Sequence, residues 1–114
     1  MDPRSVRVPD IELIWDADCP NVAPARDLLR AALDQLGLEP SWSEHEIGTD
    51  SAERHGGYGS PSILVDGQDV AGAAPSGDSD CCRIYRDVGG RFRGVPELAQ
   101  VVDALAASLA RTSI

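Results

Sequence analysis

The residues of this chain best suited to chemistry are its three cysteines, Cys19, Cys81 and Cys82. An odd number of cysteines does not fit a framework of structural disulfides, and none is expected in a compartment that keeps thiols reduced. Three uses remain for these thiols: small apolar side chains in the core, ligands for a soft metal ion, or a reactive centre.

Cys19 lies between a predicted strand and a predicted helix. Ile11–Trp15 is an apolar run typical of a central strand, and apolar residues recur at helical spacing through Val22–Leu38. A thiol just before a helix lies near unpaired backbone N–H groups and the positive end of the helix dipole, which both stabilise a thiolate. Asp16 and Asp18 oppose this, because they place negative charge beside the sulfur. We expect Cys19 to be the reactive thiol; the alternative is a small apolar side chain in a turn.

Cys81 and Cys82 follow a loop-like stretch, residues 71–80, and begin a strand-like run. Adjacent side chains of a strand point to opposite faces, so only one of the two thiols can face a site. If the flap formed by residues 71–94 folds over the start of the helix, that thiol could resolve a Cys19 adduct or share a metal ion with Cys19. The alternative is a pair of buried, inert thiols.

The remaining elements are predicted from periodicity and turn residues. They are a strand at Ser41–Ile47, a short helical turn at Asp50–His55, a hairpin of Ser62–Val65 and Gln68–Val70 through Asp66-Gly67, a small hairpin or flap of Cys82–Arg86 and Gly90–Arg93, and an amphipathic helix from Pro96 to Leu109. This order predicts an α/β domain over residues 11–114, preceded by a flexible lead-in at residues 1–10.

The chain resembles the thioredoxin-like superfamily in three respects. These are a Cys between the first strand and the first helix (IWDADCPNV), a Gly-Ser-Pro before the third strand (GSPSILVDG), and the order of the elements. It is also similar to small bacterial proteins with CPN, GSP and CRxY motifs, labelled thioredoxin-like or alkylmercury lyase-like. The resemblance covers Ile11–Leu109. It implies a thioredoxin-like (glutaredoxin-like) βαβ–ββα sandwich, a four-stranded mixed sheet with helices on its faces.

The same resemblance implies roles for residues around Cys19. Pro61 would be the cis-proline that packs beside the active-site thiol. Ser60 would be the residue whose backbone pairs with an incoming thiol substrate, and Pro20 would belong to the same substrate-binding surface. A dithiol oxidoreductase has a second Cys three positions after the first, whereas this chain has Val22 there, so a self-contained CxxC cycle is impossible.

The leading hypothesis is a thioredoxin-like thiol protein in which Cys19 forms a mixed disulfide or another thiolate adduct. Cys82, which fits the CRxY pattern, or Cys81 or an external low-molecular-weight thiol would resolve the adduct; no cofactor is required, and the partner is such a thiol or a protein thiol or disulfide. In a second hypothesis Cys19 and Cys82 bind Hg(II) or an organomercurial, and Asp18 or Asp80 protonates the departing carbon. A third is a non-catalytic binding module.

Composition excludes other classes of function. The 114 residues carry 10 basic and 19 acidic side chains, a net charge of −9, and every base is an arginine. Such a charge disfavours nucleic acid and anionic membranes. No apolar run reaches the length of a signal peptide core or a membrane span, so we expect a cytoplasmic protein.

Two further groups of polar residues carry weaker signals. His45 and His55 lack zinc-like spacing and are expected to be surface imidazoles. Four arginines fall close together; they could steer an anionic thiol or partner to the flap, or balance neighbouring aspartates. The arginines are Arg83, Arg86, Arg91 and Arg93, and the aspartates are Asp78, Asp80 and Asp87. Three aromatic residues, Tyr58, Tyr85 and Phe92, are expected to pack in the interior.

Overall fold

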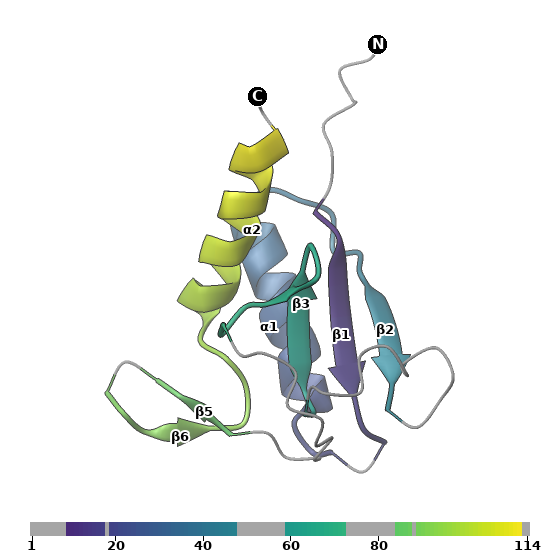
Figure 1. The fold of residues 1–114 in the computed structure, drawn as a ribbon, viewed down its shortest axis with the longest axis vertical. Coiled ribbons are helices and arrows are strands. Elements are labelled where there is room, and N and C mark those ends of the chain that lie inside the picture. The colour runs from purple at the N-terminus through teal and green to yellow at the C-terminus, as the bar shows by residue number, and fades with distance from the viewer. Residues whose placement is uncertain (1–8, 18, 48–58, 73–83, 88, 113–114) are drawn as a thin grey trace.

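The structure, a computed structural model, describes residues 9–17, 19–47, 59–72, 84–87 and 89–112. Its elements, in chain order, are β1 (Ile11–Trp15), α1 (Val22–Gln35), β2 (Ser43–Glu46), β3 (Ser62–Val65), β4 (Gln68–Asp69), β5 (Tyr85–Arg86), β6 (Phe92–Arg93) and α2 (Leu98–Thr112) (Figure 1). The predicted helical turn at residues 50–55 lies outside the described residues.

The first four strands form one mixed sheet in the order β2-β1-β3-β4. β1 pairs in parallel with β2, with Glu12 opposite Ser43, and antiparallel with β3, with Ile11 opposite Val65. β3 continues antiparallel into β4. Because β1 has a neighbour on each side, its continuous apolar run suits a central strand. The predicted α/β class and four-stranded mixed sheet are confirmed.

The turn between β3 and β4 is the hairpin turn that Asp66-Gly67 predicts. Both residues have positive φ, 52° and 84°, as a mirror-image hairpin turn requires. The Asp66 carboxylate also accepts hydrogen bonds from the Asp10 backbone N–H at 3.1 Å and from the Ser108 hydroxyl at 2.5 Å. One turn residue therefore links β3 to the start of β1 and to α2.

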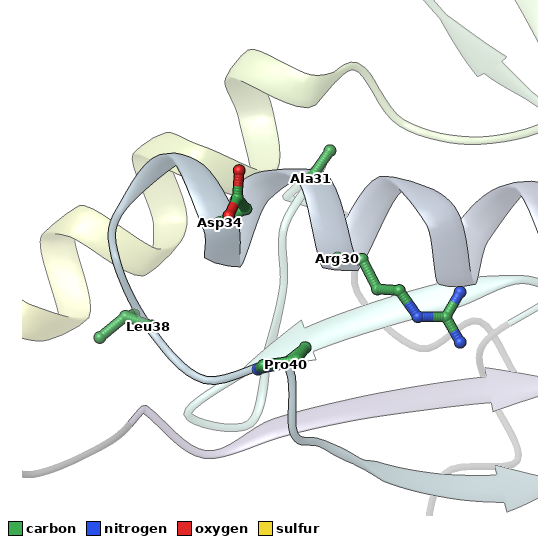
Figure 2. Close-up of a pocket in the computed structure, with 5 residues that line it drawn as sticks. All are labelled: Arg30, Ala31, Asp34, Leu38 and Pro40. Atoms are coloured by element: carbon green, nitrogen blue, oxygen red, sulfur yellow. The ribbon is translucent and has the colours of Figure 1, made fainter.

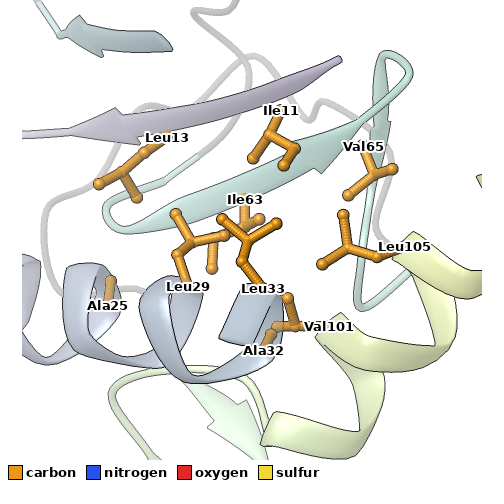
Figure 3. Packing of buried hydrophobic residues seen from close by; sticks show 10 residues of the cluster. All are labelled: Ile11, Leu13, Ala25, Leu29, Ala32, Leu33, Ile63, Val65, Val101 and Leu105. Carbon is orange, nitrogen blue, oxygen red and sulfur yellow. The ribbon is translucent and has the colours of Figure 1, made fainter. Parts of the chain in front are cut away.

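Both described helices pack against the same face of the sheet, where they also pack against each other (Figure 1). Alternate residues of β1 and β3 point toward them and form the main core (Figure 3). Its members are Ile11, Leu13, Ala25, Leu29, Ala32, Leu33, Ile63, Val65, Val101 and Leu105. On the other face of the central strands Ile14 and Leu64 are buried as well, so β1 and β3 are covered on both sides. Among the described helices, none is long and apolar enough to cross a membrane.

Helix α1 ends just before Gly37, as a glycine at this place in the sequence predicts, although the apolar pattern continues to Leu38. Gly37 takes a positive φ of 71°, and the Leu38 N–H turns back to the Leu33 carbonyl oxygen at 2.9 Å. The Gly37 N–H bonds the Asp34 carbonyl oxygen at 3.0 Å, which completes a glycine-based helix cap. Leu36 and Leu38 still pack against the core from this cap. The hydrophobic periodicity therefore continues past the last helical residue.

Candidate functional site

Cys19 lies in the connection between β1 and α1, two residues before the N-cap of the helix. Its backbone N–H donates to the Asp16 carbonyl oxygen at 3.0 Å, which closes a turn immediately after β1. Its thiol is free, and the residue is 8% exposed. Only an edge of Cys19 therefore reaches solvent, while Pro20 beside it is exposed.

The thiol contacts the residue that precedes the start of β3. Cys19 Sγ lies 3.6 Å from the Ser60 carbonyl oxygen, within hydrogen-bonding range for sulfur. The Ser60 hydroxyl accepts the Asp16 backbone N–H at 2.8 Å, so Ser60 is attached to both ends of the turn that carries Cys19. Ser60 and Pro61 are fully buried, and the peptide bond between them is cis. The structure thus brings Cys19, Ser60 and Pro61 together, because β1 and β3 are neighbours in the sheet.

The start of α1 leaves backbone donors directed toward the connection that holds Cys19. The N-cap residue, Asn21, makes no side-chain capping hydrogen bond, and the first turn contains no acidic residue. The N–H groups of a first helical turn have no partner inside the helix. The positive end of the α1 dipole therefore lies near the thiol, in the same connection as the carboxylate of Asp16.

The Asn21 side chain packs instead on the backbone of Gly94. A Cβ atom built on Gly94 would lie 2.3 Å from Asn21 Nδ2, closer than any real contact allows. Only a glycine therefore fits against Asn21 as it stands. This contact holds the chain after β6 against the start of α1.

Tyr85 of β5 anchors the small β5–β6 hairpin to the same region. Its ring is 4% exposed, and its hydroxyl donates to the Pro61 carbonyl oxygen at 2.5 Å. Sequence considerations predict only packing for this tyrosine. The CRxY motif, in which it is the last residue, was the available signal that it belongs to the site.

The turn of the hairpin is organised by Asp87. Its carboxylate accepts the backbone N–H groups of Gly89 and Arg91, each at 2.9 Å, and Arg93 Nε at 3.0 Å. These donors, the Arg91 N–H most of all, lower the pKa of Asp87 below the ordinary aspartate value. The ion pair of Asp87 with Arg93 confirms, for one of the four clustered arginines, the prediction that a neighbouring aspartate balances its charge.

Two predicted side-chain environments are wrong. Phe92 is 67% exposed rather than packed, because it lies on the outward face of the two-stranded β5–β6 sheet. His45 is not a surface imidazole: its side chain is 13% exposed, and Nε2 lies 3.0 Å from Glu12 Oε2. The cause is the parallel pairing of β1 with β2, which sets Ile14 opposite His45 and so brings Glu12 alongside.

A second polar cluster fixes α1 to β2 near the end of β1. Arg26 makes two hydrogen bonds to the Glu44 carboxylate, at 3.0 and 2.8 Å, and lies over the Trp15 ring at 5.5 Å. Trp42 Nε1 donates to the same carboxylate at 2.9 Å. The Arg26 guanidinium, and to a lesser extent Trp42, lower the pKa of Glu44 below the ordinary glutamate value. This cluster positions the first turns of the helix that begins beside Cys19.

A pocket on the described surface lies at the opposite end of α1. It is lined by Arg30, Ala31, Asp34, Leu38 and Pro40 (Figure 2). The residues come from the last turns of the helix and the loop that follows it. This pocket is therefore remote from the thiol, and it brings no nucleophile into contact with a base.

Several predicted site residues lie outside the described residues: Asp18, Asp80, Cys81 and Cys82. The resolving role of Cys81 or Cys82, and the soft-metal hypothesis that pairs Cys82 with Cys19, stay predictions from the sequence. Within the described part of the chain, no three His, Cys, Asp or Glu side chains gather as a metal site. His55 and Tyr58 also lie outside that part.

Comparisons of the chain with protein-family models, with curated proteins and with solved structures give no match. The function is therefore inferred from the contacts of Cys19 and its neighbours.

Proposed function

We propose that the chain is a thioredoxin-like thiol protein whose Cys19 carries out thiol–disulfide exchange. The observation that carries this proposal is the contact of Cys19 Sγ with the Ser60 carbonyl oxygen, at the junction of a central strand and a helix N-terminus. In open α/β sheets this end of the parallel strands is the usual place for a reactive group.

The exchange step is a displacement at sulfur. The Cys19 thiolate attacks one sulfur of a substrate disulfide, a new S–S bond forms between Cys19 and that sulfur, and the second substrate sulfur departs as a thiolate. The proton of Cys19 goes to solvent before attack.

The contacts around Cys19 support positioning of the sulfur before a substrate arrives. The backbone N–H of Cys19 is held by Asp16, and the thiol is held against Ser60. Ser60 is itself held by the Asp16 N–H. A nucleophile whose conformer is already set loses less entropy when the substrate binds.

Release of the product requires a second thiol. A thiolate attacks the substrate sulfur of the mixed disulfide, forms a new disulfide with it, and returns Cys19 as a thiolate; alternatively it attacks the Cys19 sulfur and releases the substrate thiol. Val22 occupies the position of a CxxC partner. We assign the second thiol to an external low-molecular-weight thiol or to Cys81 or Cys82.

The experiment uses the variant Cys81→Ser/Cys82→Ser, in which Cys19 is the only thiol, and a matched thiol-free variant that adds Cys19→Ser. Each is mixed with 5,5′-dithiobis(2-nitrobenzoate), and release of the coloured thiolate is followed together with protein mass. We expect one equivalent released and one mixed disulfide on the single-thiol variant, reversed by a small thiol. A folded single-thiol variant that forms no adduct would exclude the proposed function.

A further inference from the structure

The β5–β6 hairpin has two chemically different faces. Tyr85 points inward, and side chains alternate along a strand, so Ile84 and Arg86 lie on the outward face. Arg86 is the cross-strand partner of Phe92, and its guanidinium carbon lies over the Phe92 ring at 5.0 Å. Ile84 and Phe92 are each 67% exposed. The hairpin therefore presents a surface of two apolar side chains around an arginine, which we call the outer hairpin face.

This face is cationic in a strongly anionic chain. The net charge is −9, yet residues 84–93 contain three arginines and one acidic residue, Asp87. That carboxylate is engaged by Arg93. Among the described residues no carboxylate pairs with Arg86, the arginine of the outer hairpin face. Its guanidinium group therefore remains available to an external anion.

The inward side of the hairpin, opposite the outer hairpin face, is attached to the thiol site. Tyr85, whose neighbours Ile84 and Arg86 belong to the outer hairpin face, donates to the Pro61 carbonyl oxygen, and Ser60, which precedes Pro61, contacts Cys19. After β6, Gly94 packs on Asn21 at the start of α1. The hairpin is thus fixed at both of its strands to the elements that hold the sulfur.

We propose that the outer hairpin face docks an acidic segment of a partner protein whose disulfide exchanges with Cys19. This inference rests on the proposed function and adds the class of substrate. Exposed aromatic and arginine side chains in one patch are typical of residues that dominate protein interfaces. The positive charge of the outer hairpin face would bind carboxylates of the partner. Ile84 and Phe92 would pack against an apolar side chain beside those carboxylates. A low-molecular-weight thiol would cover only part of this surface.

Two synthetic peptides of equal length test the proposal, each with one cysteine activated as its mixed disulfide with 5-thio-2-nitrobenzoate. One carries glutamates and a phenylalanine beside the cysteine, and the other carries lysines in place of the glutamates. They react with the Cys81→Ser/Cys82→Ser protein, and thionitrobenzoate release gives the second-order rate constant. We expect the acidic peptide to react severalfold faster at about 0.15 M salt, where repulsion from distant carboxylates of the −9 chain is largely screened and contact with the outer hairpin face remains. The difference shrinks at high salt, because added ions screen exposed charges.

Arg86→Gln should reduce this preference, and Phe92→Ser should slow both peptides. Arg30→Gln is the matched control, since it removes the same charge from an exposed arginine on α1 and should change neither rate. Equal rates for the two peptides, with normal reaction of 5,5′-dithiobis(2-nitrobenzoate), would overturn the docking proposal and leave the proposed function intact.

If Cys19 is unreactive toward disulfides, a binding experiment tests the docking proposal on its own. A fluorescent acidic peptide with serine in place of cysteine is titrated with the protein and followed by anisotropy. Binding that Arg86→Gln weakens and Arg30→Gln does not would support the docking surface, and absence of binding would overturn it. Sedimentation supplies a last check: a dimer that Phe92→Ser converts to a monomer would assign the face to a second copy of the chain and contradict the proposal.

Discussion

Cys19 Sγ lies 3.6 Å from the carbonyl oxygen of Ser60, a residue separated from it by 41 positions in the sequence. The antiparallel pairing of β1 with β3 brings these two residues together. From there the contacts extend to Tyr85 through the Pro61 carbonyl oxygen. The thiol, the start of α1 and the β5–β6 hairpin therefore form one continuous structural unit.

Ser60→Ala should destabilise the protein, because the buried hydroxyl is the acceptor for the Asp16 backbone N–H. We expect the free energy of unfolding to fall by about 1–2 kcal/mol, the usual effect of removing one partner of a buried hydrogen bond. Urea unfolding measures the change. The matched control is Ser43→Ala, at an exposed serine of β2, which should change stability by less than about 0.5 kcal/mol. Equal losses in the two variants would contradict the assigned role of Ser60.

Tyr85→Phe should loosen the hairpin without disturbing the main sheet. The change removes the hydroxyl that donates to the Pro61 carbonyl oxygen while the buried ring is retained. Hydrogen exchange should become faster at the Asp87 and Gly90 amides, which bond within the hairpin, and should stay the same in β1 and β3. Unchanged protection of the Asp87 and Gly90 amides would show that Tyr85 does not anchor the hairpin.

Gly94→Ala should displace the Asn21 side chain. The new methyl group would lie 2.3–2.7 Å from three atoms of that side chain, so one of the two residues must move. We expect a loss of about 1 kcal/mol or less, because the contacted atoms are the end of a partly exposed side chain that can rotate away. Gly89→Ala is the control, because its nearest neighbour lies at 3.4 Å. In a double-mutant cycle Asn21→Gly should recover most of the loss, and purely additive effects would contradict the contact.

The elements that match their predictions depend on local signals. The apolar runs Ile11–Trp15 and Ser62–Val65 and the dipeptide Asp66-Gly67 carry their structure in neighbouring residues, and all three are found as predicted. The end of α1 also follows a local signal, because Gly37 caps the helix as predicted, while Leu36 and Leu38 contact the core from outside the helix. Burial alone does not tell a helical residue from a capping residue.

The features that sequence considerations missed depend on pairing between distant segments. His45 is covered because β2 lies beside Glu12 of β1, and Phe92 is exposed because its hairpin stands away from the main sheet. Neither environment follows from the local sequence. The placement of Cys19 beside Ser60 was implied by a resemblance, and periodicity did not predict it.

Glu44→Gln should make stability less dependent on pH in the acid range. The Arg26 guanidinium lowers the pKa of Glu44 in the folded state, so the folded protein binds this proton less readily than the unfolded chain. The stabilisation by the ion pair is therefore present above the ordinary glutamate range and is lost as the pH falls through the lowered pKa. Both partners are partly exposed, so we expect about 1 kcal/mol or less at neutral pH.

Urea unfolding of the native protein and of Glu44→Gln at pH 7 and at about pH 3, below the ordinary glutamate pKa, checks this sign. The difference between the two proteins should shrink on acidification. Glu39→Gln, at an exposed glutamate, is the control for removal of one negative charge. A difference that grows on acidification would contradict the role of the Arg26–Glu44 pair.

The reactivity of the Cys19 thiol tests the central claim most directly. Alkylation by iodoacetamide is measured across pH 6–9 on the Cys81→Ser/Cys82→Ser variant, folded and unfolded in urea, with free cysteine as the reference. We predict that Cys19 of the folded protein is alkylated at neutral pH at least as fast as in the unfolded chain, because an edge of its side chain reaches solvent and the contacts with Asp16 and Ser60 hold the sulfur in place. A folded thiol that reacts more slowly than in the unfolded chain would contradict the proposed role of Cys19.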